Sequence, residues 1–127
     1  MKPTAAMRLA QRSEGFVVAD SKILHAFLVS SGPFHGAEGL GQLVAGLIGV
    51  LTIVGVRRWY TVVVTATDAY IIRNRGTNMP RQLLKTVPRA LVGPISGSAK
   101  DRIMVDGHMY NLPLPWLDEA RRACRAA

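Results

Sequence analysis

The chain has one cysteine, Cys124, among its 127 residues, and only eight of its residues are Phe, Trp or Tyr. A single cysteine excludes an intramolecular disulfide framework and a four-cysteine zinc site. Acidic residues are also few, because eight Asp and Glu stand against sixteen Lys and Arg, which gives a formal net charge of +8. Such an excess indicates an anionic partner, which is nucleic acid, acidic lipid headgroups or an acidic protein face.

Motifs of enzyme and metal sites are also missing. The chain has no glycine-rich phosphate loop, no Ser-His-Asp order and no paired carboxylates. His25, His35 and His108 stand far apart with no carboxylate at ligand spacing, which disfavours a metal site. Arginines near Cys124 favour a lower thiol pKa, but we interpret this lone thiol as incidental. We therefore expect a non-enzymatic protein that needs no cofactor or metal.

The positive charge is concentrated in the middle of the chain. Residues 1–56 have a net charge of +1, residues 57–102 have +7, and residues 103–127 are neutral overall. The length suits one domain, and hydrophobic residues make up 49% of the chain, as in a globular protein. The first fifteen residues contain no apolar run of the kind that defines a secretory signal.

Residues 39–56, GLGQLVAGLIGVLTIVGV, contain no charge. As a helix this stretch would be about 27 Å long, near the lower limit for crossing a bilayer core. The residues that follow it are Arg57, Arg58, Trp59 and Tyr60. Basic and aromatic residues favour a membrane–water boundary, with the basic side cytoplasmic. This interpretation predicts a membrane-associated protein with residues 57–127 in the cytoplasm and residues 1–38 outside.

Small residues inside the uncharged stretch indicate helix packing. Gly41, Ala45 and Gly49 are spaced four apart, so on a helix they form a smooth stripe that lets a second helix approach closely. We therefore expect a homo-oligomer. Two other readings stay open: a buried packing helix in a soluble assembly, cytoplasmic or part of a virion, or two buried strands broken at a glycine.

Outside this stretch the pattern favours short strands. Strands are expected at 59–66 and 69–74, with a turn at Thr67 and Asp68. Residues 102–105 and 108–112 read as a hairpin closed by Asp106 and Gly107. Residues 87–95 contain Pro88 and Pro94, which restricts them to an edge or irregular strand.

Helices are expected nearer the chain ends. Residues 117–126 form an amphipathic pattern with acidic residues first and arginines last, which suits a C-terminal helix. A short helical pattern covers 5–12 within a polar N-terminal region that we expect to be mobile. Residues 80–86 are predicted as one or two helical turns with proline first. Residues 22–31 fit a short helix or a strand.

The segments YTVVVTATDAYIIRN, VPRALVGPISG and RIMVDGHMYNLP, followed by a final helix, resemble bacterial pleckstrin-homology-like domains over about residues 57–127. The whole chain is similar to short actinobacterial and actinobacteriophage proteins with a glycine-rich hydrophobic segment before such a domain. The sequence departs from the family at Ala69, where a basic residue usually follows Thr-Asp. The resemblance implies an antiparallel sheet, completed by a strand from residues 15–29 or by another subunit.

The fold expected is therefore α+β: a small antiparallel sheet with a C-terminal capping helix, preceded by one glycine-rich hydrophobic helix. Its parts are an N-terminal segment 1–38, the helix 39–56 and a domain 57–127. The basic residues expected to bind an anion or partner are Arg73, Arg75, Arg81, Lys85, Arg89, Lys100 and Arg102.

These parts predict a membrane-associated adaptor or binding module with a basic face for anionic lipid or a protein partner. The alternative is a soluble structural subunit of a homo-oligomeric assembly, such as a virion shell. Nucleic acid fits only the charge, because Tyr60, Tyr70 and Tyr110 fall at strand positions that face a core instead of stacking on bases.

Overall fold

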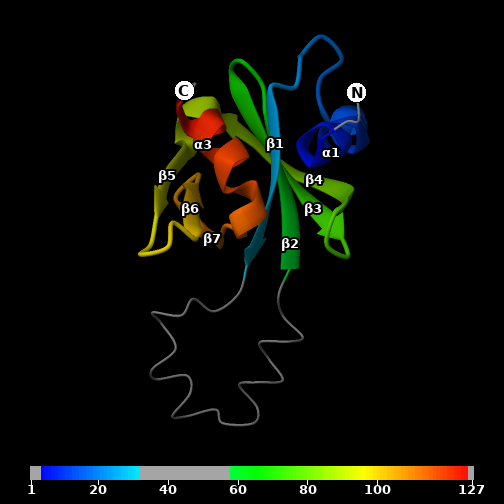
Figure 1. The fold of residues 1–127 in the computed structure, drawn as a ribbon. Coiled ribbons are helices and arrows are strands. Elements are labelled where there is room, and N and C mark those ends of the chain that lie inside the picture. Colours follow the sequence, from blue (N-terminus) through cyan, green and yellow to red (C-terminus); the bar gives the residue numbers. More distant parts are fainter. Residues whose placement is uncertain (1–3, 32–57, 126–127) are drawn as a thin grey trace.

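The computed structural model describes residues 4–31 and 58–125. Seven antiparallel strands form one sheet in the order β4-β3-β2-β1-β7-β6-β5 (Figure 1). The strands are β1 (His25–Ser31), β2 (Arg58–Val64), β3 (Asp68–Arg75), β4 (Met79–Pro88), β5 (Val92–Ser96), β6 (Arg102–Val105) and β7 (His108–Asn111). The helices are α1 (Ala5–Ser13) and α3 (Leu117–Arg125), with short 3-10 turns η1 (Glu14–Phe16), η3 (Arg89–Leu91) and η4 (Leu114–Trp116). The expected α+β class is confirmed.

The three neighbouring strands β1, β2 and β3 are buried on both faces. Alternate residues of a strand point to opposite faces of a sheet. Phe27, Val62 and Ile71 belong to a core that includes α3 residues, while Leu28 and Val63 belong to a second core that includes α1 residues. Double burial explains why these strands have continuous apolar runs instead of a polar–apolar alternation.

The two helices cover opposite faces of the sheet formed by β1, β2 and β3 (Figure 1). Helix α1 packs on the sheet, although the polar character of its sequence led us to expect a mobile segment. Its Leu9 is buried against the sheet, and the Thr4 side chain caps its first turn by accepting a hydrogen bond from the Met7 amide at 3.1 Å. Helix α3 is tied to β1 by a hydrogen bond between His25 Nδ1 and Glu119 Oε2 at 2.6 Å.

Both expected hairpins are present. Strands β2 and β3 are joined at Thr65, whose amide donates to the Asp68 carbonyl at 2.8 Å. Strands β6 and β7 are joined by Asp106 and Gly107, which have φ values of 53° and 76°. Positive φ at both central residues is what a two-residue type I′ turn requires, and Asp-Gly meets that requirement at low cost.

Residues 80–86 are not helical, which corrects the expectation from their sequence. They lie in the edge strand β4, which pairs with β3 and has register shifts opposite Ile71/Ile72 and Arg73/Asn74. An edge strand tolerates Pro80 and Pro88 because one side of its backbone needs no ladder partner. Pairing with β3 therefore outweighs the local helix preference.

Strand β1 joins the N-terminal segment to the rest of the sheet. Ser31 lies opposite Arg58, so the chain leaves and re-enters the sheet at adjacent positions. Residues 25–31 and 58–64 are paired along their whole length, so a bilayer cannot lie between them. An orientation with residues 1–38 outside and 57–127 in the cytoplasm is therefore incompatible with this pairing.

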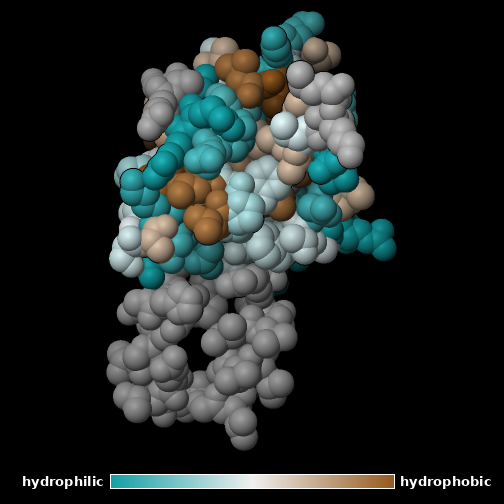
Figure 2. Space-filling model, viewed as in Figure 1, coloured by the Kyte–Doolittle hydropathy of each residue, from teal (hydrophilic) through white to brown (hydrophobic). Residues whose placement is uncertain are grey.

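The expected glycine-rich helix 39–56, with its packing stripe Gly41, Ala45 and Gly49, lies outside the described residues. Within residues 4–31 and 58–125, no helix is both long enough and apolar enough to cross a bilayer. Among the described residues on the face shown in Figure 2, hydrophobic residues form separate patches between hydrophilic ones.

Candidate functional site

Four arginines gather where β2, β3 and β4 meet the Ser31–Arg58 end of the sheet. We call Arg58, Arg73, Arg75 and Arg81 the arginine cluster; all four are exposed. Arg73 lies opposite Tyr60 of β2 and Gln82 of β4, while Arg75 lies opposite Met79. Tyr60 and Arg73 are a cross-strand pair of the antiparallel strands β2 and β3. Arg58 and Arg75 each lie two residues from this pair, toward the same end of the sheet.

The arginine cluster has no carboxylate partner among the described residues, where the ion pairs between charged side chains are made by Lys85 and Arg122. Closely placed like charges without counter-ions repel each other and create a positive local potential. Arg73 of the cluster lies opposite Tyr60, which makes an edge-to-face contact with Tyr110 at 5.5 Å between ring centroids. His108 in turn lies 4.7 Å from Tyr110. The arrangement suits an anion bound at a surface. From the sequence, Tyr60 and Tyr110 were expected at core-facing strand positions, but their contact with each other was not predicted.

Lys85 is near these residues but differs from them in having a partner. Its Nζ donates to Asp106 Oδ2 at 2.7 Å, which joins the edge strand β4 to the turn between β6 and β7. Both side chains are partly exposed, so the pair contributes at most about 1 kcal/mol. Lys85 therefore adds little free positive charge to the cluster.

Arg89 is not an exposed binding residue, which corrects its inclusion in the expected basic set. It is only 7% exposed. Its guanidinium donates to the carbonyls of Thr65 and Ala123, each at 3.3 Å. Ala123 lies in the last turn of α3, where carbonyls lack partners within the helix and favour a cation. Arg89 therefore holds the end of α3 against the sheet.

The last two residues of the expected basic set lie elsewhere. Lys100 is in the turn between β5 and β6, and Arg102 begins β6. Strands β5 and β6 are at the opposite end of the strand order from β3 and β4. The predicted set of seven thus divides into the clustered Arg73, Arg75 and Arg81 and four residues with other surroundings.

The residues expected at a membrane boundary do not form one belt. Arg57 lies outside the described residues, and Arg58 is exposed at the start of β2. Trp59 packs with the core under α1, whereas Tyr60 packs with the core under α3. Adjacent strand residues point to opposite faces, so both aromatic side chains are explained by packing.

Burial raises the pKa of two groups near these elements. The Tyr110 pKa is raised first by burial and then by the neighbouring Tyr60 and Asp106. Burial also raises the pKa of the Cys124 thiol, which packs beside Gly93. The nearby arginines therefore do not activate the thiol, and Cys124 stays a neutral packing residue.

These two shifts predict a loss of stability in alkali. A raised folded-state pKa stabilises the fold at a pH below the ordinary thiol and phenol values, and this contribution is lost as pH rises through the folded-state values. We expect the free energy of unfolding to fall above roughly pH 8.5 to 10. Urea unfolding at a series of pH values measures it. An equally steep loss in the double variant Tyr110→Phe, Cys124→Ala would contradict this origin.

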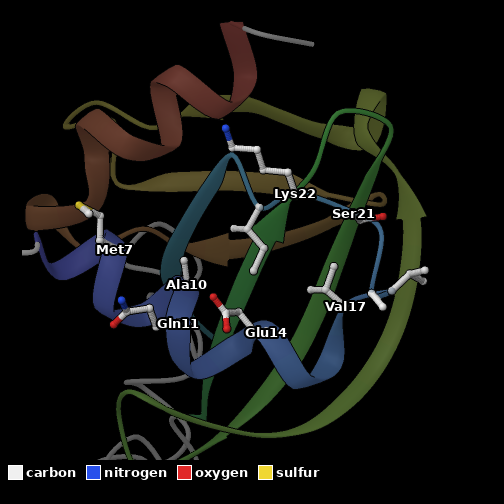
Figure 3. Close-up of a pocket in the computed structure, with 10 residues that line it drawn as sticks. Met7, Ala10, Gln11, Glu14, Val17, Ser21 and Lys22 are labelled. Carbon is white, nitrogen blue, oxygen red and sulfur yellow. The ribbon is translucent and has the colours of Figure 1, made fainter.

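A cavity of about 450 Å³ lies between α1 and residues 17–23. In Figure 3, Gln11 lies on α1 and Glu14 at the start of η1, and the Lys22 amine is turned away from the Glu14 carboxylate. The two ionisable side chains that line this cavity, Glu14 and Lys22, therefore do not converge as an acid–base pair would. Across the described part of the chain, no group of three His, Cys, Asp or Glu side chains could hold a metal ion.

Comparisons with known proteins leave the site to be judged on its geometry. No protein-family model, curated protein or solved structure matches the chain.

Proposed function

We propose that the chain is a non-enzymatic, membrane-associated binding module whose arginine cluster contacts the headgroups of anionic lipids. The observation that supports this most strongly is the pairing of Ser31 with Arg58. Ser31 and Arg58, the residues that flank 32–57, therefore lie at the end of the sheet that bears the cluster. The sequence of 32–57 includes eighteen consecutive uncharged residues. Apolar sequence next to unpaired arginines is the combination that anionic membranes bind.

A pleckstrin-homology-like fold is part of the same proposal. Seven antiparallel strands followed by a C-terminal helix agree with what the sequence resemblance implies. The N-terminal segment supplies β1, so the sheet needs no strand from another subunit to reach seven. These features support the family without a match to any relative.

The energetics favour a reversible contact. A basic residue near an anionic leaflet contributes about 1 kcal/mol, so four arginines contribute about 4 kcal/mol. This attraction is screened within about 10 Å at 0.1 M salt. Nucleic acid is the weaker candidate for the same charges, because Tyr70 and Tyr110 are buried and Tyr60 is half-buried, which leaves no exposed stacking platform beside the cluster.

Association of copies is the second candidate function, as in a homo-oligomeric shell. The edge strand β4 favours it, because Met79, Leu83 and Leu84 are exposed large hydrophobic side chains. An exposed apolar edge strand can pair with another chain. Arg81 and Lys85 on the same strand oppose pairing of two β4 strands, since like charges would meet.

Co-sedimentation of the full-length protein with vesicles tests the proposed function. We expect binding to phosphatidylcholine vesicles that contain phosphatidylglycerol, little binding to phosphatidylcholine alone, and weaker binding at higher salt. A soluble species of defined high mass in size exclusion, indifferent to both kinds of vesicle, would overturn the proposal in favour of the assembly.

A further inference from the structure

A groove of about 470 Å³ lies between α1 and the turn that joins β3 to β4. It is on the face of the sheet opposite Arg73 and Arg75. Arg8 and Arg12 line it from α1, Thr77 and Asn78 from the turn, and Leu28 and Trp116 from the sheet and η4. Residues four apart on a helix share a face, with about 5–6 Å between their Cβ atoms. The two guanidinium groups can therefore reach the same small ligand.

The two arginines of the groove lack a carboxylate partner within residues 4–31 and 58–125. Like charges at this spacing destabilise a helix slightly, and no acidic residue stands in the first turn of α1 to offset them. A bound anion would remove that repulsion. Guanidinium groups match the oxygens of a phosphate in geometry and bind it with paired hydrogen bonds.

The wall of the groove opposite α1 is held in place by a buried side chain. Asn74 is 8% exposed, and its amide nitrogen donates to the Thr77 carbonyl at 2.9 Å. Its amide oxygen accepts from the Thr61 hydroxyl at 2.6 Å. These bonds fix the turn that presents Thr77 and Asn78. A fixed wall lowers the ordering cost of binding.

We propose that this groove binds a phosphate group through Arg8 and Arg12, with the remainder of the ligand resting on Leu28 and Trp116. The phosphate belongs either to a soluble phosphomonoester or to a lipid headgroup, since both present the same oxygens. Asn74 and the groove lie on the face of β3 opposite Arg73 and Arg75. The inference is therefore independent of the proposed function of the arginine cluster.

Tryptophan fluorescence of the full-length protein tests this site, with a Trp59→Phe background so that Trp116 is the sole reporter. The probes are glycerol 3-phosphate, glycerol as the control without phosphate, and phosphatidylcholine vesicles containing phosphatidic acid. We expect a saturable change with phosphate-bearing probes and none with glycerol. Saturation by glycerol 3-phosphate supports a soluble ligand. Saturation by the vesicles alone supports a headgroup when it is retained in the Arg73→Gln, Arg75→Gln variant, because the arginine cluster is also proposed to bind anionic vesicles.

The double variant Arg8→Gln, Arg12→Gln should weaken this binding by roughly tenfold or more, because it removes charge-assisted hydrogen bonds. The matched control is Lys22→Gln, Lys100→Gln, which removes the same charge from exposed positions outside the groove. Circular dichroism checks that both variants fold. No saturable binding of either phosphate probe, or an equal loss in the control, would overturn the groove. The variant Arg73→Gln, Arg75→Gln should leave glycerol 3-phosphate binding intact, which separates this test from that of the cluster.

Discussion

Replacing Arg73 and Arg75 together by glutamate is expected to abolish binding of the full-length protein to anionic vesicles. Each replacement removes an attraction of about 1 kcal/mol and adds a repulsion of similar size, so the pair costs about 4 kcal/mol. That corresponds to a loss of affinity of roughly a thousandfold. Both side chains are exposed on β3, so the fold should tolerate the change. Flotation of vesicles with bound protein measures the loss.

The control for this experiment has the same change in net charge at other places. Lys22→Glu with Lys100→Glu reverses two exposed lysines, one before β1 and one in the turn between β5 and β6. We expect this variant to retain most of its binding, because attraction depends on the distance of a charge from the lipid surface. Equal losses in the two double variants would show that net charge alone governs binding and would contradict a defined arginine cluster.

Replacing Arg89 by alanine is expected to be the most damaging change to stability among the arginines of the described chain. The substitution leaves the Thr65 and Ala123 carbonyls without their buried donor. A lost hydrogen bond to a charged group costs about 1.5 to 3 kcal/mol, so we expect a decrease of about 2 to 4 kcal/mol in the free energy of unfolding. Urea unfolding followed by circular dichroism measures it.

Arg81→Ala is the matched comparison for this stability experiment. It removes the same side chain from an exposed position on β4, where a substitution changes stability by about 0.5 kcal/mol or less. If Arg89→Ala changed stability no more than Arg81→Ala, the link from Arg89 to the end of α3 would be wrong.

Local sequence was sufficient for the hairpins and the C-terminal helix. Asp106-Gly107 supplies two positive φ angles between apolar runs, and residues 117–125 place Asp118 and Glu119 in the first turn of α3. Each of these signals acts over a few residues and needs no distant partner. Elements of this kind can be predicted from one sequence.

Elements whose conformation depends on distant partners were predicted less well. Residues 80–86 become a strand because β3 offers an edge to pair with. Residues 25–31 fit helix and strand equally in sequence, and pairing with β2 across 26 residues decides for the strand. Nothing in the local sequence distinguishes Arg89 from the exposed Arg81. Its structural role depends on α3, whose Ala123 carbonyl accepts a hydrogen bond from the Arg89 guanidinium. The groove arginines Arg8 and Arg12 gave no signal, because the turn opposite them is over sixty residues away in the chain.

The central consequence of the fold is that the chain on both sides of the uncharged stretch forms one sheet. Strand β1 comes before residues 39–56 and β2 comes after them, and the two pair along seven residues. Under the proposed function, such a module contacts a membrane from one side, with the arginine cluster at the end of the sheet where Ser31 pairs with Arg58.

Sidedness of labelling tests this claim most directly. Two single-cysteine variants, Lys22→Cys and Lys100→Cys, are made in a Cys124→Ala background and expressed in cells from which sealed membrane vesicles are prepared. Both sites are exposed, one before β1 and one after β2. A membrane-impermeant maleimide should label both sites equally or neither until the vesicles are opened. Labelling of one site with protection of the other would place β1 and β2 on opposite sides and contradict the sheet.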